Sequence, residues 1–198
     1  MWAQQTGDLV PLSVQELISC EKRDSACEGG LPDNAYSYIQ THGLVSEEYF
    51  PYQSSDGELV PCDVDDWVGP NVYNSYALPD VVVPTGWISG FKDIPKKRED
   101  IMREVLARHP ISVAVDATKW QFYKSGIFNH LDCGASLNHA VQIVGYSMID
   151  KFYTVRNSWG TGYGEDGYIR VVMDHDMCGI AQSASFPTVL EQRSAVAI

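Results

Sequence analysis

His139 and Asn157 are the two residues of this sequence whose types and surroundings best suit catalysis. In thiol chemistry, an imidazole takes the sulfhydryl proton and later protonates the leaving amine of a peptide, so the nucleophile is a thiolate beside an imidazolium. An amide oxygen on the second ring nitrogen fixes the tautomer of the imidazole without adding charge. The sequence therefore predicts that His139 is the acid–base group and that Asn157 orients it. Trp159 is expected to pack over their hydrogen bond and to keep water from it.

The thiol that this chemistry requires is not found in the corresponding place. A known signature puts the nucleophilic cysteine in C-G-[SA]-C-[WY], with the histidine and the asparagine about 130 to 150 residues downstream. His139 and Asn157 already lie that far from Met1, so we expect the matching cysteine upstream of the first residue. The sequence thus predicts a chain that carries the histidine and the asparagine without the cysteine, and that begins inside its domain.

Eight short motifs, all in one order, make the sequence similar to the papain-like cysteine proteases, which include the cathepsins. The resemblance runs from Met1 to about Pro187. It opens at Thr6–Cys20, which looks like the T-G-x-L-x-x-L-S-x-Q-x-L-x-x-C stretch that follows the helix carrying the nucleophile. The other motifs are C-E-G-G at 27–30, Y-F-P-Y at 49–52, L-N-H-A-V at 137–141, V-G-Y at 144–146, N-S-W-G at 157–160, G-Y-G-E-D-G-Y at 162–168 and C-G-I at 178–180. The family usually has tryptophan at the position of Tyr163.

The resemblance implies an α+β, papain-like fold of two lobes with the active site in the cleft between them. Residues 1–88 are expected to form the helical left lobe, incomplete at its N-terminus. Residues 89–190 are expected to form an antiparallel, β-barrel-like right lobe, followed by a tail at 191–198. The residues at 1–5 resemble the end of the nucleophile helix.

Local patterns predict the elements that position these residues. Ser13 and Glu16 form a capping box, which predicts that a helix begins there. Proline near the start and glycine after the end predict a second helix over 32–42, and an apolar stripe predicts a third over 97–109. Residues 63–87 contain three prolines and no sustained period, which predicts a long irregular connection. Its aspartates at 63, 65 and 66 predict a solvated acidic loop rather than a calcium site, because the glycine and glutamate of a calcium loop are absent. Strands are predicted at 111–115, 141–146, 151–155 and 168–173.

Five cysteines are an odd number, so at least one stays unpaired in an oxidising compartment. The resemblance implies disulfides joining Cys20 to Cys62 and Cys133 to Cys178. It leaves Cys27 unpaired, because its partner would lie just before the nucleophile. The alternative is a cytosolic protein with five reduced, buried cysteines. The spacing of cysteines and histidines matches no zinc motif, so we expect no metal and no cofactor.

The resemblance also implies the substrate-binding residues. Gly30 would present its backbone to an extended peptide, because a missing side chain lets the two strands approach closely. The apolar residues among those expected to bind substrate imply a preference for an aliphatic or aromatic residue one position before the scissile residue. Taken one at a time, each of them could instead be a core residue. The expected substrate-binding residues are Gly29, Gly30, Leu31, Pro32, Ala114, Leu137, Asn138, Ala140 and Ser183.

The composition and net charge of the chain limit the classes of molecule that it can bind. The chain has 198 residues, is 44% hydrophobic and carries a net charge of -12, so it suits a globular core and repels polyanions. We therefore expect neither a nucleic acid nor a membrane as a partner, and the sequence shows no signal peptide. The resemblance implies a peptide or protein substrate, a propeptide or cystatin-like inhibitor, and a complementing N-terminal fragment. It also implies a lysosomal or extracellular location.

Three hypotheses follow from these patterns. The first is a cysteine endopeptidase whose nucleophile lies outside this sequence, so that the chain alone is inactive. The second is a non-catalytic pseudoprotease that binds peptides or inhibitors and regulates an active relative. The third is an unrelated structural α+β protein, which the ordered motifs disfavour.

Overall fold

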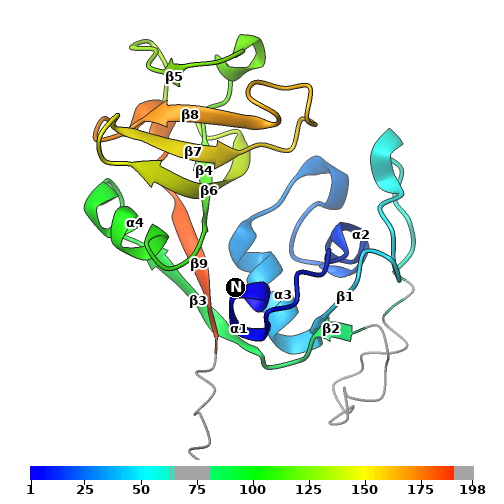
Figure 1. Cartoon of the computed structure of the whole chain (residues 1–198). Coiled ribbons are helices and arrows are strands. Elements are labelled where there is room, and N and C mark those ends of the chain that lie inside the picture. The colour runs from blue at the N-terminus through cyan, green and yellow to red at the C-terminus, as the bar shows by residue number, and fades with distance from the viewer. Residues whose placement is uncertain (63, 65–80, 190–198) are drawn as a thin grey trace, which may run out of the picture. The chain divides into compact units, whose positions relative to one another are not determined.

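The computed structural model describes residues 1–62, 64 and 81–189 (Figure 1). The chain divides into two compact units, one made of Met1–Phe91 together with the end of the chain from Pro187, the other of Lys92–Phe186. The sequence placed this change at residue 88. The expected tail at 191–198 and the acidic residues Asp63, Asp65 and Asp66 lie outside the described residues.

The first unit is mainly helical, and its helices begin and end where the sequence places their signals. The Ser13 side chain accepts a hydrogen bond from the Glu16 backbone N–H (2.9 Å) and caps the second helix. Pro32 occupies the first turn of the third helix, and Gly43, with φ 84°, ends it. The elements are α1 (Trp2–Thr6), α2 (Val14–Cys20), η1 (Ala26–Glu28), α3 (Pro32–His42), η2 (Ser54–Asp56) and the antiparallel pair β1 (Leu44–Val45) and β2 (Val81–Val83).

Only one of the two reciprocal hydrogen bonds of a capping box forms between Ser13 and Glu16. The Glu16 carboxylate turns into the core, where it accepts hydrogen bonds from the Tyr38 hydroxyl (3.1 Å) and the Val45 backbone N–H (2.8 Å). The Ser13 backbone N–H donates instead to the Val45 carbonyl (3.0 Å). Glu16 therefore links α2 to α3 and β1, and its burial is compensated by these two hydrogen bonds.

The second unit is built on a sheet whose strands follow the order β3-β9-β4-β6-β7-β8-β5. The strands and helices are β3 (Ile88–Ile94), α4 (Glu99–Leu106), β4 (Ile111–Val115), η4 (Trp120–Phe122), β5 (Ile127–Phe128), β6 (His139–Ser147), β7 (Phe152–Arg156), β8 (Tyr168–Val172), η5 (Met177–Gly179) and β9 (Ala184–Val189). Strands β3 and β9 continue across the boundary between the two units.

The expected barrel is not formed by the described strands, which make an open, mostly antiparallel sheet. Strand β5, two residues long, is an edge strand and pairs in parallel with β8. Strand β3 forms the other edge, so the sheet does not close on itself. A strand of two residues offers too few ladder hydrogen bonds to join a further partner, which is a physical reason for the open edge.

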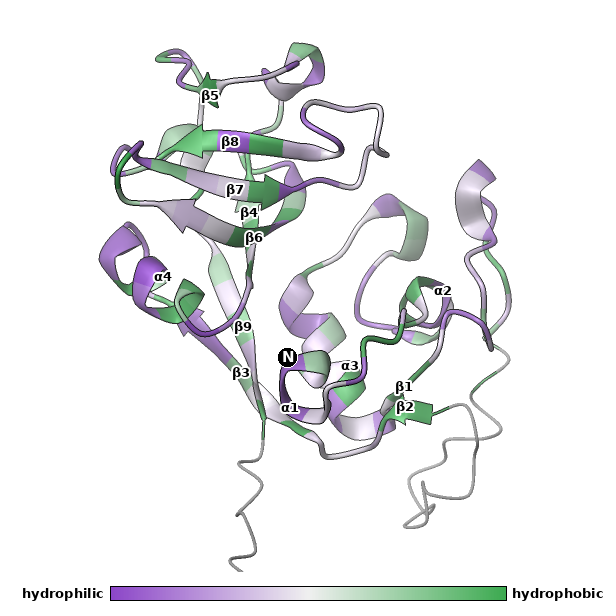
Figure 2. Ribbon diagram, viewed as in Figure 1, coloured by the Kyte–Doolittle hydropathy of each residue, from purple (hydrophilic) through white to green (hydrophobic). Residues whose placement is uncertain are grey.

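Burial in the second unit follows the predicted periods. Ile111, Val113 and Val115 of β4 are buried, whereas the residues between them are half-buried. In α4, which is shorter than the predicted 97–109, Met102 and Leu106 are buried in the same core. Figure 2 shows hydrophobic colour in β8 on both sides of one hydrophilic band. Within the ranges that the structure describes, the helices lack the length and apolar character that a membrane span requires.

Candidate active site

Strand pairing in the second unit brings His139 and Asn157 together. His139 is the first residue of β6, and Asn157 directly follows Arg156, the last residue of β7. The two strands are antiparallel, with Gln142 opposite Arg156, so the start of one lies beside the end of the other. His139 Nε2 lies 2.8 Å from Asn157 Oδ1. The two residues expected to act together are therefore hydrogen-bonded.

The surroundings of Asn157 determine which way its amide points. Oδ1 accepts a second hydrogen bond from the Ser158 backbone N–H (2.8 Å), which only an oxygen can do. Because an amide oxygen only accepts, the proton between the two side chains sits on His139 Nε2. In the neutral ring, His139 Nδ1 is then left without a proton and can take one from a nucleophile.

Aromatic rings lie beside the His139 member of this hydrogen bond. The rings of His139 and Trp159 are stacked, with centroids 5.1 Å apart and planes at 26°. Trp159 meets Tyr163 edge to face at 4.9 Å and 84°. Trp159 is 41% exposed, whereas Tyr163 is buried. Trp159, which the sequence predicts to pack over the pair, thus contacts the His139 ring on one side and the buried Tyr163 ring on another.

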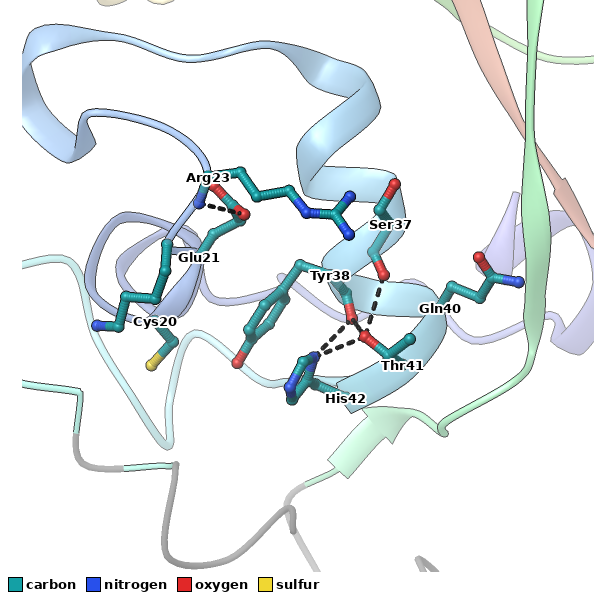
Figure 3. A pocket seen from close by; sticks show the side chains of 9 residues that line it. Cys20, Glu21, Arg23, Ser37, Tyr38, Gln40, Thr41 and His42 are labelled. Carbon is teal, nitrogen blue, oxygen red and sulfur yellow. Dashed lines mark hydrogen bonds between the residues drawn. The ribbon is translucent and has the colours of Figure 1, made fainter. Parts of the chain in front are cut away.

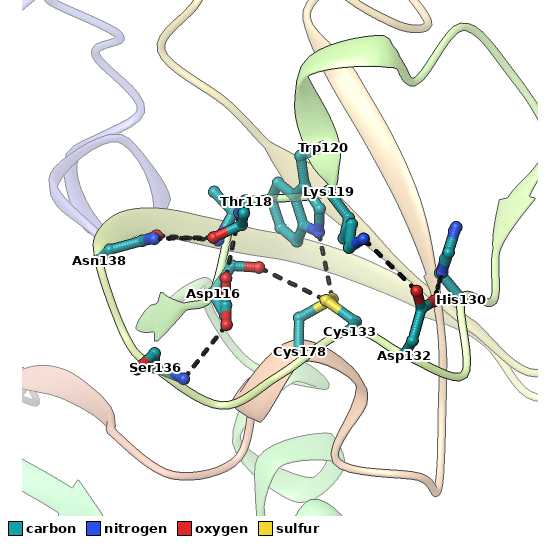
Figure 4. Close-up of a disulfide and its surroundings, with 11 residues drawn as sticks. Asp116, Thr118, Lys119, Trp120, His130, Asp132, Cys133, Ser136, Asn138 and Cys178 are labelled. Carbon is teal, nitrogen blue, oxygen red and sulfur yellow. Dashed lines mark hydrogen bonds and ion pairs between the residues drawn. A yellow bond between two sulfur atoms is a disulfide. The ribbon is translucent and has the colours of Figure 1, made fainter.

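A turn held by Asp116 and Asn138 leads into His139 (Figure 4). The Asp116 carboxylate accepts hydrogen bonds from the backbone N–H groups of Thr118 (3.1 Å) and Ser136 (3.2 Å). Asn138 Oδ1 accepts from the Ala117 N–H (2.9 Å), and Asn138 Nδ2 donates to the Thr118 hydroxyl (3.2 Å). Four hydrogen bonds therefore fix the chain just before the candidate base.

Asp116 is a positioning residue that sequence reasoning missed. Hydrogen bonds from the side chain and the backbone N–H of Thr118 hold the pKa of Asp116 below its ordinary value. An aspartate that follows a strand, with threonine two residues later, is a signal for a turn in which the carboxylate accepts a backbone N–H. That signal was present in the sequence.

The disulfide between Cys133 and Cys178 ties the same turn to η5 (Figure 4). The indole N–H of the buried Trp120 donates to Cys178 Sγ (3.3 Å). In the first unit, Cys20 is bonded to Cys62. Cys27 is free and exposed. These are the pairs, and the unpaired residue, that the resemblance implied.

Strand register gathers several of the expected substrate-binding residues in the second unit. Ala114 lies opposite Ala140, and the Ala114 N–H donates to the Ser183 carbonyl (2.9 Å). Ala140 and Ser183 are exposed, and Leu137 is 39% exposed and lies against Gly179. Exposure of these neighbouring residues is compatible with contact to a ligand. Asn138, by contrast, uses its side chain within the turn described above.

The expected substrate-binding residues of the first unit are Gly29, Gly30, Leu31 and Pro32. They follow η1 and enter α3, and the first three are exposed. The Asp24 carboxylate accepts hydrogen bonds from the Leu31 N–H (3.1 Å) and Asn34 Nδ2 (2.6 Å) and lies where a Cβ on Gly30 would be. Gly30 therefore has a structural reason to lack a side chain, independent of any substrate.

A cavity of about 400 Å³ in the first unit contains none of the expected substrate-binding residues (Figure 3). It lies between the end of α2 and α3, where the His42 ring stacks on Tyr38 at 4.3 Å. It is lined by Cys20, Glu21, Lys22, Arg23, Ser37, Tyr38, Gln40, Thr41 and His42. These residues show no pairing of a nucleophile with a base.

Residues 1–188 match the model of a family described as papain family cysteine protease. The chain is 40% identical to cysteine proteinase EP-B 1 of Hordeum vulgare over 196 residues, which are 93% of this chain and 49% of that protein. It is 38% identical to procathepsin L of Rattus norvegicus over 198 residues, 93% of this chain and 54% of that protein. The chain thus spans about half the length of these relatives.

A solved structure has the same fold. The bromelain protease from Ananas comosus, in complex with the E64 inhibitor, superposes with a TM-score of 0.78 at 34% identity and covers 96% of this chain and 83% of that one. A match over this share of both chains includes the helical elements and the sheet.

Proposed function

Because the chain belongs to the papain family of cysteine proteases, we propose that His139 and Asn157 belong to a Cys-His-Asn centre that hydrolyses peptide bonds. The observation that carries this proposal is the 2.8 Å contact between His139 Nε2 and Asn157 Oδ1 beneath the Trp159 ring. It holds the imidazole in one tautomer, with Nδ1 ready to accept a proton.

In the proposed reaction, His139 accepts a proton and donates it again in each of the two halves of the cycle. A cysteine thiol gives its proton to His139 Nδ1, and the thiolate attacks the carbonyl carbon of the scissile peptide. The imidazolium then protonates the leaving amine, and a thioester remains on the sulfur. Water, deprotonated by the same imidazole, hydrolyses the thioester and restores the thiol. Asn157 keeps the ring in place throughout, and Trp159 keeps bulk water from their hydrogen bond.

We propose that the 198-residue chain does not carry out this reaction by itself. Cys20, Cys62, Cys133 and Cys178 are held in disulfides, which cannot supply a thiolate. Cys27 is free, but it matches a disulfide position of the family rather than the nucleophile. The thiol would come from a complementing segment that resembles the helix before Thr6–Cys20.

The proposed substrate is a peptide or protein with an aliphatic or aromatic residue one position before the scissile residue. Exposed Leu137, Ala140 and Ser183 lie next to the candidate base in the chain or through β4, which supports a contact surface there. A propeptide or a cystatin-like inhibitor would use the same residues. The two disulfides favour an oxidising compartment, so we propose a lysosomal or extracellular location.

The experiment measures turnover of a fluorogenic peptide that carries Leu or Phe before the scissile residue. The chain is assayed alone and fused to a segment bearing C-G-x-C-W. We expect turnover only from the fusion, a loss of about 10⁴-fold or more with His139→Ala, and a loss of about 10²-fold with Asn157→Ala.

His130→Ala is the matched control, because His130 is an exposed histidine paired with Asp132. The fused chain should keep its activity in this variant. Turnover by the chain alone that disappears with His139→Ala would refute the proposed inactivity. A folded fusion that turns over no peptide but still binds an immobilised inhibitor would favour the pseudoprotease.

A further inference from the structure

Two buried polar atoms beside the candidate active site have no hydrogen-bond partner among the described residues. They are Asn157 Nδ2 and the Tyr163 hydroxyl oxygen, each of which is shielded from solvent. An unpaired buried polar group destabilises a fold, and native structures contain few of them. Two such atoms in one small aromatic cluster therefore require an explanation.

Each atom supplies what the other lacks. Asn157 Oδ1 is already used by His139 and Ser158, so Nδ2 is left with its two donor hydrogens. A phenol oxygen can accept a hydrogen bond. Tyr163 lies in the same cluster, because its ring meets Trp159 at 4.9 Å and Trp159 stacks on His139. The two atoms are thus complementary.

The titration of Tyr163 agrees with this pairing. Burial raises the pKa of Tyr163 to about 12, which keeps the phenol neutral. Asn157 acts in the opposite direction and lowers the pKa of Tyr163, as a donor to the hydroxyl oxygen does.

We propose that the Tyr163 hydroxyl accepts a hydrogen bond from Asn157 Nδ2 and so positions the amide whose Oδ1 orients His139. Tyr163 is then a positioning residue, and its catalytic purpose rests on the proposed function above, whereas the hydrogen bond itself does not. Tryptophan at this position could cover the pair, but its indole N–H only donates and could not accept from Nδ2. The hydroxyl prevents the Asn157 amide from rotating away from His139.

The test is an NMR measurement on the ¹⁵N-labelled 198-residue chain. The Asn157 side-chain amide is identified by its loss in Asn157→Asp. We expect its protons to exchange with solvent roughly tenfold faster in Tyr163→Phe, which removes the oxygen but keeps the ring. Tyr163→Trp should have the same effect. Unchanged exchange in folded Tyr163→Phe would overturn the proposal.

Tyr123→Phe is the matched control. Tyr123 is buried, its ring lies 6.1 Å from that of Tyr163, and its hydroxyl donates to the Gly126 carbonyl (2.6 Å). Loss of this hydroxyl should leave the exchange of the Asn157 amide unchanged. An equal acceleration in both variants would indicate general loosening and would contradict a specific hydrogen bond.

A second readout covers the case in which Tyr163→Phe does not fold. The ¹³Cζ resonance of Tyr163 is compared between the parent chain and Asn157→Ala, and a shift is expected on loss of the donor; no shift would overturn the proposal. Neither measurement needs turnover, so a peptidase assay that fails bears on the proposed function alone. In an active fusion, Tyr163→Phe should lower kcat roughly five- to tenfold with KM unchanged.

Discussion

The His139–Asn157 pair and the loop at 27–31 both contain residues expected to act in catalysis or binding, but they are built differently. The pair stands at the ends of two paired strands, beneath stacked rings and over a buried sheet. The loop consists of exposed residues, and a single side chain, Asp24, holds its end through the Leu31 N–H. The geometry of the pair is thus a property of the whole sheet, whereas that of the loop depends on one carboxylate and on short-range backbone hydrogen bonds to Ser25 and Ala26.

The largest expected effect is a loss of stability, and it should differ between the buried sheet under the pair and the exposed loop. Ile143 lies in β6 with no exposed surface, so Ile143→Ala leaves a cavity beneath the strand that carries His139. We expect a loss of about 2–5 kcal/mol in the free energy of unfolding, measured by urea denaturation. Leu31→Ala, at a residue 60% exposed, is the matched control and should change it by less than about 0.5 kcal/mol. Equal losses would contradict the comparison.

An intermediate effect is expected inside the loop. Gly30→Ala places a methyl group where the Asp24 side chain lies and forces that carboxylate from its hydrogen bonds. We expect a loss of about 1–3 kcal/mol in the free energy of unfolding. In an Asp24→Gly background the same substitution should cost much less, because every side-chain atom that a methyl group on residue 30 would meet is gone. A double-mutant cycle with no coupling between the two positions would show that Gly30 is not required by Asp24.

The smallest effect concerns pH and the turn before His139. Because the pKa of Asp116 is lowered in the folded chain, its hydrogen bonds contribute stability above the ordinary aspartate pKa of about 3.9, and this contribution is lost as the pH falls below it. Urea midpoints from pH 6 to pH 2.5 should therefore converge between the parent chain and Asp116→Asn at the acid end. Asp8→Asn removes an exposed carboxylate and controls for net charge. A difference that stays constant with pH would argue against the role of Asp116.

Much of this protein followed from local patterns in the sequence. The cap at Ser13, the proline at 32 and the glycine at 43 defined two helices, because caps and breakers act through neighbouring backbone groups. The strand over 111–115 was found at its observed bounds, because its alternation matches the pleat. Eight ordered motifs indicated the family, to which the chain belongs. They also singled out His139 and Asn157.

Other features depended on contacts between residues far apart in the sequence. The sequence predicts that Glu16 is half of a capping box, but its carboxylate is buried in the core, where it accepts hydrogen bonds from Tyr38 and Val45. The sheet is open because β5 pairs only briefly with β8, a fact that no period in the sequence encodes. Gly30 accommodates Asp24, and Tyr163 lies with its hydroxyl buried beside the candidate pair. Local signals choose helices, strands and residue types, but strand register and burial decide which side chains meet.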